Sequence, residues 1–503
     1  MQGVDAIVVG GGIAGLTSAV ALAEEGSRVL ILERSRTFGG RAQSFIEPHT
    51  GHSLPIGPHV FLDNYANLLA LLDRLGTREH VLWDGAPELT VTDGARALQG
   101  RLDWGPPPFH FWPALVKRPD KGPLEILANL PALLFSLQVD ERAVLELDQL
   151  DAATVLRWLG VPASSQTSLW SFMGRSILNV PLDRCSAGSL FRFSHYALGS
   201  RAPRFGYADR GLGELFAPAA SRLLPSLGSA VRTGCAVRSL LFEDQRVVGV
   251  ELHDGTIVRS RFVIVTAPGD ALSAMLPARV RADASLAFLR GFEPSPYVSV
   301  FLWFDRKLTR RRFWARSFRP GDFGCDFYDL SNIYRGWDER PSLVAANIIY
   351  SHRVHALDDR EIAERIRSEL SEFFPAAARE RMRHWAVRRI PMAIACPLPG
   401  FEGQRPLQAT RFPGLYLAGD ATRTGLPSSM ESAARSGWLA AEGVLAELGR
   451  KRTLARPLPP VATLPRAYAR AARALPVQPA RALLAAHRTL ERLHATARRL
   501  RPA

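Results

Sequence analysis

A glycine-rich segment near the N-terminus constrains the fold more than any other part of the sequence. An apolar run over residues 5–9 leads directly into a G-x-G-x-x-G motif. The glycines of this motif are Gly10, Gly12 and Gly15. Residues 14–25 then carry apolar side chains at helical spacing, and residues 28–33 have the pattern of a second buried strand. Together these features predict a βαβ unit of about 30 residues that binds a dinucleotide.

Each part of the motif has a physical role in such a unit. Gly10 allows the tight turn after the strand, and Gly12 allows the backbone to approach a pyrophosphate. Gly15 permits close packing of the helix against the strand. Because the helix begins near Ile13 and Ala14, its first N–H groups point toward the anion, and we include both residues in the candidate cofactor site.

The second strand is followed by an acidic residue and a loop with two glycines. Glu33 is placed to accept hydrogen bonds from a ribose diol and to repel a 2′-phosphate, which argues against NADP. The loop from Arg34 contains Gly39, Gly40 and Arg41, so its backbone can lie along the pyrophosphate while the guanidinium offsets the charge. Here the chain resembles the FAD-binding amine-oxidase and phytoene-desaturase superfamily, which has this loop as its second fingerprint. The resemblance implies FAD as the cofactor.

A second candidate cofactor segment lies near residue 420. A short strand ends in Gly419 and Asp420, and either Ser428 or Ser429 can cap the helix that follows. The resemblance implies that Asp420 approaches the ribityl chain and that the backbone at Met430 faces the pyrimidine end of the flavin. The start of a helix suits that place, because reduced flavin carries negative charge there.

The segments between these two sites predict a discontinuous nucleotide domain. Three further strand patterns lie between residues 231 and 268, and the resemblance places the backbone of Val237 against the adenine. We therefore predict an α/β fold: a Rossmann-type FAD-binding domain with an interleaved α+β substrate domain. The predicted boundaries are 1–75, 205–285 and 405–449 for the FAD-binding domain, and 76–204 and 286–404 for the substrate domain.

Several segments narrow the resemblance to one branch of the superfamily. Gly57, Pro58 and His59 resemble the G-x-H segment of plant-type phytoene desaturases and bacterial hydroxysqualene dehydroxylases. Residues 178–181 resemble a dehydroxylase stretch, and residues 298–306 match a strand of both families. The resemblance implies that the G-x-H segment adjoins the flavin, and His59 is our candidate for a catalytic polar group near the ring.

At three places the sequence differs from one of these related families in a way that concerns the substrate. Residues 54–56 are Leu-Pro-Ile where the dehydroxylases carry an acidic residue and an asparagine, and Pro58 replaces a glutamine. These changes weaken the case for a hydroxysqualene substrate. Amine oxidases carry an aromatic residue before the position of Met430, where this chain has Ser429, and this difference argues against amine oxidation.

The substrate class implied by the resemblance is a long isoprenoid hydrocarbon. Hydride would pass between an allylic carbon and flavin N5, either in desaturation or, in the opposite direction, in reductive dehydroxylation. Residues 124–137 are apolar on nearly every side. They fit either an apolar tunnel with a lipid-facing surface or a buried core helix. Aromatic residues in the same half of the chain are Phe109, Phe111, Trp112 and Trp170.

The net charge of +15 is concentrated in the last part of the chain. Residues 450–503 contain thirteen Lys and Arg residues against one acidic residue, and so contribute +12. Four prolines in the first part of this tail predict a stiff linker: Pro457, Pro459, Pro460 and Pro465. From Arg481 onward, arginines and apolar residues fall on opposite sides of a predicted helix, which suits an anionic membrane surface. A helix packed on the body and a disordered tail are the alternatives.

Other classes of protein are disfavoured by the sequence. The charge lies in one arm and no recognisable module accompanies it, so we expect no nucleic-acid partner. The four cysteines form no C-x-x-C pair, and His352 and His355 lack a third ligand nearby, so we expect no metal site. Serine-hydrolase and P-loop motifs are missing from the sequence. We expect a cytoplasmic, peripherally membrane-bound enzyme with a quinone as a possible electron acceptor.

Overall fold

The computed structural model describes residues 3–93, 96–103, 105–111, 122–290, 293–316, 319, 321–474, 485–486 and 489. Its first sheet has the order β10-β2-β1-β13-β12-β11, and β19 pairs with β13. The strands are β1 (Val4–Val9), β2 (Val29–Leu32), β10 (Ala230–Arg232), β11 (Val237–Glu243), β12 (Arg246–Leu252), β13 (Ile257–Val265) and β19 (Leu415–Leu417). The pairs that join β10, β2, β1, β13 and β19 are parallel. The predicted α/β fold is confirmed.

Helices cover this sheet and complete what we call the nucleotide lobe. They are α1 (Ile13–Glu24), α11 (Ala217–Ser226), α12 (Gly269–Met275), α13 (Ala278–Arg281) and α17 (Met430–Glu447). Every residue of α1 from Ile13 to Ala23 is buried, because α17 lies along it. The backbone carbonyl of Gly437 accepts a hydrogen bond from Ser18 Oγ at 3.2 Å, which shows how closely the two helices approach.

The second sheet belongs to what we call the sheet lobe and has the order β18-β14-β17-β16-β15-β7-β8. Its strands are β7 (Glu88–Asp93), β8 (Arg96–Arg101), β14 (Pro294–Phe304), β15 (Phe313–Arg316), β16 (Asp326–Asp329), β17 (Leu343–Ile349) and β18 (Met382–Ala395). Side chains alternate across it, so one face packs on α14 (Asp359–Phe373) in a core that includes Val300, Phe327 and Ile348. The short helix α15 (Ala376–Arg379) follows α14.

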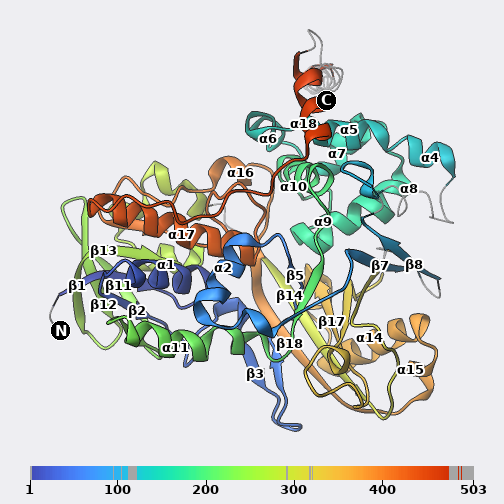
Figure 1. Cartoon of the computed structure of the whole chain (residues 1–503), viewed down its shortest axis with the longest axis horizontal. Coiled ribbons are helices and arrows are strands. Elements are labelled where there is room, and N and C mark those ends of the chain that lie inside the picture. The colour runs from blue at the N-terminus through green and yellow to red at the C-terminus, as the bar shows by residue number, and fades with distance from the viewer. Residues whose placement is uncertain are drawn as a thin grey trace, which may run out of the picture.

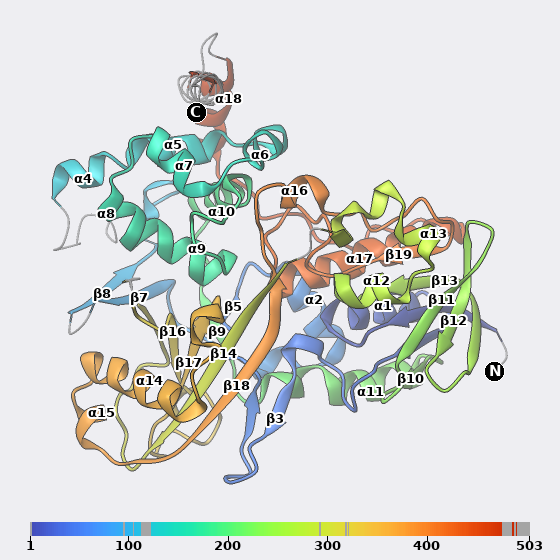
Figure 2. The same cartoon turned by 180° about the vertical axis from the view of Figure 1, so that it is seen from behind.

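A group of helices forms the third part of the molecule, which we call the helical lobe. It contains α4 (Pro123–Leu127), α5 (Leu130–Gln138), α6 (Glu141–Leu147), α7 (Ala152–Trp158), α8 (Ala163–Ser165), α9 (Ser171–Leu178) and α10 (Ala187–Gly199). Figure 1 shows the nucleotide lobe at the left, the helical lobe at the upper right and the sheet lobe below it. In the view from behind, the long strands β14 and β18 run from the sheet lobe toward the nucleotide lobe (Figure 2).

Short elements connect the three lobes. They are the hairpin β3 (Ser44–Ile46) and β4 (Ser53–Pro55), the small sheet of β5 (Phe61–Leu62), β9 (Phe205–Ala208) and β6 (Val81–Trp83), and the helices α2 (Ala66–Leu75) and α16 (Phe401–Gln404). The strands of the first sheet come from residues 4–32, 230–265 and 415–417, whereas the second sheet uses residues 88–101 and 294–395. The domain boundaries that we gave remain a prediction.

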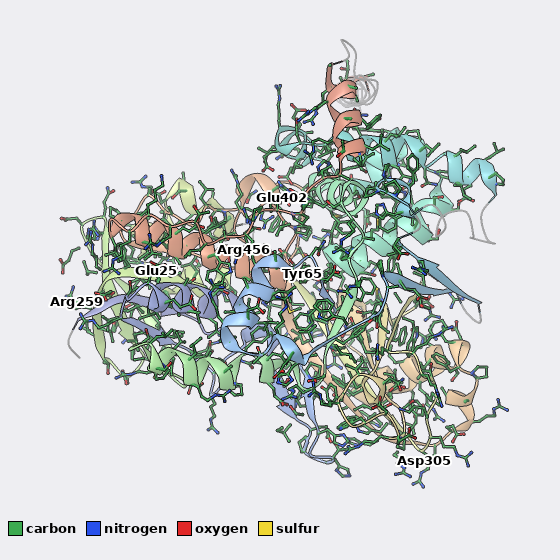
Figure 3. All side chains as sticks on the ribbon, viewed as in Figure 1. Glu25, Tyr65, Arg259, Asp305, Glu402 and Arg456 are labelled. Carbon is green, nitrogen blue, oxygen red and sulfur yellow. The ribbon has the colours of Figure 1, made fainter. Side chains whose placement is uncertain are left out.

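The first part of the C-terminal tail lies against the body. Residues 450–462, which we call the strap, are hydrogen-bonded to α17 and α2: the backbone N–H groups of Leu454 and Ala455 donate to Glu442, and that of Arg456 donates to Asn67. Figure 3 shows Arg456 near Tyr65, at the start of α2. The prediction that the linker extends to Pro465 is wrong. Helix α18 (Thr463–Ala474) begins two residues before Pro465 and buries it.

Helix α18 packs against α5 of the helical lobe. Gln138 donates to the Tyr468 hydroxyl at 2.8 Å, and Arg473 lies 3.2 Å from Asp140. The basic amphipathic helix that we predict from Arg481 onward lies outside the described residues, apart from residues 485–486 and 489. Among the described helices, none is long and apolar enough to cross a lipid bilayer.

Candidate active site

A cavity of about 1430 Å³ is lined by residues of all three lobes. The predicted cofactor residues in its wall are Gly10, Gly12, Ile13, Ala14, Glu33, Arg34, Gly39, Gly40, Arg41, Pro58, His59, Val237, Gly419, Asp420, Ser429 and Met430. Gly15 and Gly57 are the two predicted residues that do not line it. Segments separated by four hundred residues in the sequence are therefore brought together at one cavity.

The two glycine-rich loops contact each other through their backbones. Gly39 N–H donates to the Gly11 carbonyl at 2.8 Å, and a Cβ atom on Gly40 would lie 3.1 Å from Gly12 Cα. Gly40 also has a φ of +55°, a conformation that other residues rarely adopt. The loops thus leave a cradle of bare backbone at the start of α1, where N–H groups meet an anion.

Gly15 acts through packing, as the sequence predicts. A Cβ atom at Gly15 would lie 2.0 Å from the carbonyl oxygen of Gly10, the residue that makes the turn after β1. Gly10 has a φ of +104°, so this turn has little freedom to move away. Gly15 supports the cofactor cradle from behind although it does not line the cavity.

Glu33 is buried at the end of β2, with only 6% of its surface exposed. Its Oε2 accepts the Gly11 N–H at 2.7 Å, and its Oε1 accepts the Ser35 N–H at 2.8 Å. These bonds fix the carboxylate in the cavity wall beside the first glycine loop. A carboxylate oxygen accepts more than one hydrogen bond, so Glu33 retains acceptor capacity for a ribose diol.

Arg41 and Asp420 join the two halves of the candidate cofactor site. The Arg41 guanidinium forms two hydrogen bonds with the Asp420 carboxylate and donates to the Ala393 carbonyl at 2.8 Å. Although burial opposes it, the charge of Asp420 raises the pKa of Arg41, so this cation is retained. Arg405, which the sequence analysis missed, donates to the carbonyls of Asp420 and Leu426 and so shapes the loop between them.

The helix that starts at Met430 has the predicted cap. Ser429 Oγ accepts the Ser432 N–H at 3.1 Å, which settles the choice between Ser429 and Ser428. Glu431, in the first turn, caps a different helix: its carboxylate accepts the N–H groups of Asn67 and Leu68 at the start of α2. The starts of α17 and α2 are thus tied together at the cavity wall.

Burial raises the pKa of Glu431 to about 7, so this contact predicts a pH-dependent stability. The folded chain keeps the Glu431 proton up to about pH 7, whereas the unfolded chain releases it near pH 4.5. Stability therefore falls as the pH rises through this window, by up to roughly 3 kcal/mol. We expect Tm of the wild type to fall relative to that of Glu431→Gln between pH 5 and pH 8. Parallel Tm curves for the two proteins would contradict this.

His59 lies in the cavity wall on the loop before β5. Its Nδ1 lies 2.8 Å from the Gly57 carbonyl, which can only accept, so Nδ1 carries the proton. Desolvation in the cavity lowers the pKa of His59, and the positive charge of Arg41 lowers it further. The ring is therefore neutral at pH 7 and presents Nε2 as an acceptor. Its catalytic role remains a prediction.

The part of the cavity beyond His59 is mostly apolar. Side chains from the helical and sheet lobes that line it include Phe111, Leu133, Leu169, Trp170, Phe172, Met173, Ile177, Phe193, Phe205, Phe313 and Ile349. The segment 124–137, for which we considered a wall of an apolar tunnel or a buried core helix, has features of both. It breaks into α4 and α5, with Leu133 in the cavity wall and Phe135 in the core, whereas Leu124 is 82% exposed.

Four polar side chains at this apolar end were not predicted from the sequence. Tyr297, Asp326, Tyr328 and Asn347 line the cavity from neighbouring strands of the second sheet. A polar residue within an otherwise apolar strand could have indicated this group. The sequence alone, however, does not show which face of the sheet points into the cavity, so the polar side chain cannot be placed there. Asn347, between Ala346 and Ile348 on β17, is the clearest case.

The cradle fits FAD because bare glycine backbone and a helix start meet there, with Glu33 on one side and Arg41 on the other. These features are typical of oxidoreductases that bind a dinucleotide at the carboxyl ends of a parallel sheet, next to a separate substrate-binding region. The sequence pattern of the flavin-containing amine oxidoreductases matches residues 13–445. The chain belongs to this family and is a FAD-dependent oxidoreductase, which confirms the resemblance and the predicted cofactor.

Individual relatives agree with this assignment. The chain is 26% identical over 469 residues to the 15-cis-phytoene desaturase of Narcissus pseudonarcissus, covering 88% of this chain and 80% of that protein. It is 24% identical over 476 residues to the 15-cis-phytoene desaturase of Synechococcus elongatus, covering 90% and 98%. The structure of cyclohexylamine oxidase from Brevibacterium oxydans shares the fold, with a TM-score of 0.65, 18% identity and coverage of 89% and 100%.

Proposed function

We propose that this enzyme desaturates a long-chain isoprenoid hydrocarbon of the carotenoid or squalene type. The observation that carries the proposal is the continuity of the cavity: one space runs from the glycine cradle to a chamber of aromatic and aliphatic side chains. A polyene has no charge to recognise, so shape and apolar contact must hold it. Relatives named as phytoene desaturases, similar along most of the chain, support the same substrate class.

Different residues of this chain would bind the cofactor and the substrate. The glycine loops, Glu33, Arg41 and Asp420 would hold FAD, with Val237 at the adenine end and Met430 at the flavin end. Bound FAD supplies a two-electron acceptor for hydride from carbon. The apolar chamber aligns the polyene and excludes water. It would thereby hold the reacting carbon next to the cofactor, and this positioning lowers the barrier to hydride transfer.

Two other activities are alternatives to desaturation. Reductive dehydroxylation of hydroxysqualene would use the same chamber, and residues 178–181 resemble that family, but residues 54–56 lack its acidic residue. Oxidation of a soluble amine fits less well, because Ser429 precedes Met430 and the chamber is mostly apolar.

The deciding experiment is anaerobic incubation of the FAD-loaded enzyme with phytoene, ζ-carotene, squalene, hydroxysqualene and an aliphatic amine in separate reactions. We expect bleaching of the oxidised flavin absorbance and a product with two fewer hydrogens only with a polyene. Conversion of hydroxysqualene to squalene by the pre-reduced enzyme would establish the dehydroxylase instead. Bleaching with the amine alone would overturn the proposal.

We also propose that the enzyme works at an anionic membrane surface and passes electrons to a quinone. An apolar substrate and a quinone both dissolve in lipid, and the tail beyond α18 is strongly basic. Because the strap and α18 pack on the body, the proper truncation ends at Ala474. We expect this variant to keep its Tm but to lose flotation with anionic vesicles, and unchanged flotation would contradict the role of the tail.

A further inference from the structure

The second sheet carries a short row of polar side chains next to the apolar chamber. Ser299, Asn347 and Asp326 are cross-strand neighbours on β14, β17 and β16. Ser299 Oγ donates to Asn347 Oδ1 at 2.8 Å, and Asn347 Nδ2 lies 3.3 Å from Asp326 Oδ2. The row ends at Asp326, because its next cross-strand neighbours are Ala315 and Val91.

The row connects the chamber with the loop that carries His59. Asn347 Nδ2 also donates to the Pro58 carbonyl at 3.2 Å, and a Cβ atom on Gly57 would lie 3.2 Å from Ser299 Oγ. The loop therefore rests directly on the polar row, while Pro58 and His59 line the same cavity as Asp326. Asp326 thus lies one hydrogen-bonded side chain away from the cofactor end of the cavity.

Asp326 differs from Asp420, Glu33 and Glu431 in the cavity wall, because neither a cation nor the backbone N–H group of another residue contacts its carboxyl within the described part of the chain. Asp420 is paired with Arg41, and Glu33 and Glu431 accept backbone N–H groups. Asp326 Oδ2 accepts from the Tyr328 hydroxyl at 2.8 Å. Within the described part of the chain, its Oδ1 has no hydrogen-bond partner and the carboxyl forms no ion pair.

The groups that face Asp326 leave its proton labile near neutral pH. They are Tyr297 from β14, Tyr328 from β16, and Cys325, which immediately precedes β16; His59 lines the same cavity. Burial raises the pKa of both tyrosines and of Cys325, and lowers that of His59, so these groups are neutral at pH 7. Burial likewise raises the pKa of Asp326, to about 6. A carboxyl in this range exchanges a proton readily under physiological conditions.

We propose that Asp326 is the catalytic residue that accepts the substrate proton, an inference that rests on the proposed desaturation. Forming a C=C bond from two adjacent CH groups removes a hydride and a proton. The hydride, with both electrons of its C–H bond, leaves to the oxidised flavin, which is thereby reduced. The proton on the neighbouring carbon leaves to the Asp326 carboxylate as the electrons of its C–H bond become the new π bond. Asp326 then returns the proton to water.

The test is the variant Asp326→Asn, which keeps the shape of the side chain but accepts no proton. We expect FAD to bind as in the wild type, while the anaerobic rate of flavin reduction by phytoene falls about 10²- to 10⁴-fold. In the wild type this rate should rise with pH through about 6. The matched control is Asp305→Asn at the far end of the sheet lobe (Figure 3), where Asp305 pairs with Arg383.

A second variant tests the proposal without removing the carboxyl. Tyr328→Phe removes a hydrogen bond that lowers the pKa of Asp326, so the pH profile should shift to higher pH. In the difference between the infrared spectra of substrate-free wild type and Asp326→Asn, the C=O band of one protonated carboxyl should titrate with the same pKa, whereas the band of Glu431, present in both proteins, cancels.

Each outcome of these experiments has a defined meaning. Flavin reduction in Asp326→Asn within threefold of Asp305→Asn overturns the role of Asp326 and leaves the proposed function intact. If Asp326→Asn does not hold FAD, Tyr328→Phe decides, and an unshifted pH profile overturns the role. If the wild type reduces no flavin with any polyene, the proposed function fails, and the role of Asp326 fails with it.

Discussion

Gly15→Ala is expected to yield a protein that no longer retains FAD. The new Cβ would lie 2.0 Å from the Gly10 carbonyl and 3.2 Å from Thr266 Oγ1, so the start of α1 must move off the end of β1. Overpacking of this kind costs about 1–3 kcal/mol. The displacement also turns the first N–H groups of α1 away from the anion. We expect the flavin content at purification to fall more than tenfold, measured as the ratio of flavin to protein absorbance.

The matched control for this change is Gly85→Ala. A Cβ at Gly85 would meet no atom within 4 Å, and this glycine does not have a left-handed φ. The control should retain wild-type flavin content and Tm, because it makes the same chemical change in open space. Full flavin content in Gly15→Ala would show that the cradle does not depend on the contact of α1 with the turn after β1.

Arg41→Ala is expected to weaken FAD binding by at least tenfold and to destabilise the apoprotein. The substitution leaves the Asp420 carboxylate, 6% exposed, without its cation. Removing one partner of a fully buried pair costs about 3–5 kcal/mol. The Arg41 side chain is 39% exposed, so we expect a smaller loss, of roughly 2 kcal/mol. Denaturant unfolding of the apoprotein and a titration with FAD measure the two effects separately.

A double variant separates the role of Arg41 in stability from its role in binding. In Arg41→Ala with Asp420→Asn the unpaired charge is gone, so stability should recover while FAD affinity remains low. Arg389→Ala is a surface control, because its pair with Asp359 is partly exposed on both sides and such pairs contribute about 0–1 kcal/mol. Equal stability losses in Arg41→Ala and Arg389→Ala would contradict the importance of the pair.

The cofactor half of the site was predictable because its signals are local. Strand, glycine motif and helix occupy residues 4–24 without interruption, and the structure places α1 within one residue of the predicted start. The cap at Ser429 is equally local. By contrast, the contact of Arg41 with Asp420 joins residues 379 positions apart, and only the packing of the lobes brings them together.

The substrate half was harder to predict because its signals depend on tertiary context. Asp326 lies on a strand of four residues, too short to show which face is covered. In the apolar segment 124–137, Pro131 marks the break between α4 and α5, but the hydrophobicity of the segment does not show which side chains line the cavity. The prolines of the tail predict a linker that includes Pro465, but this residue lies in the first turn of α18, where proline is tolerated.

The dependence of the first sheet on β19 and α17 has a consequence for biosynthesis. The ribosome makes the glycine loops first, but the strand that ends at Leu417 and the helix that buries α1 follow only after residue 414. Until then the face of α1 that α17 covers is exposed, although the sheet and α11 can already pack on its other sides, and the nascent chain lacks Asp420 and Met430. We therefore expect flavin not to stabilise the growing chain, and the incomplete protein to be prone to aggregation until its last ninety residues are synthesised.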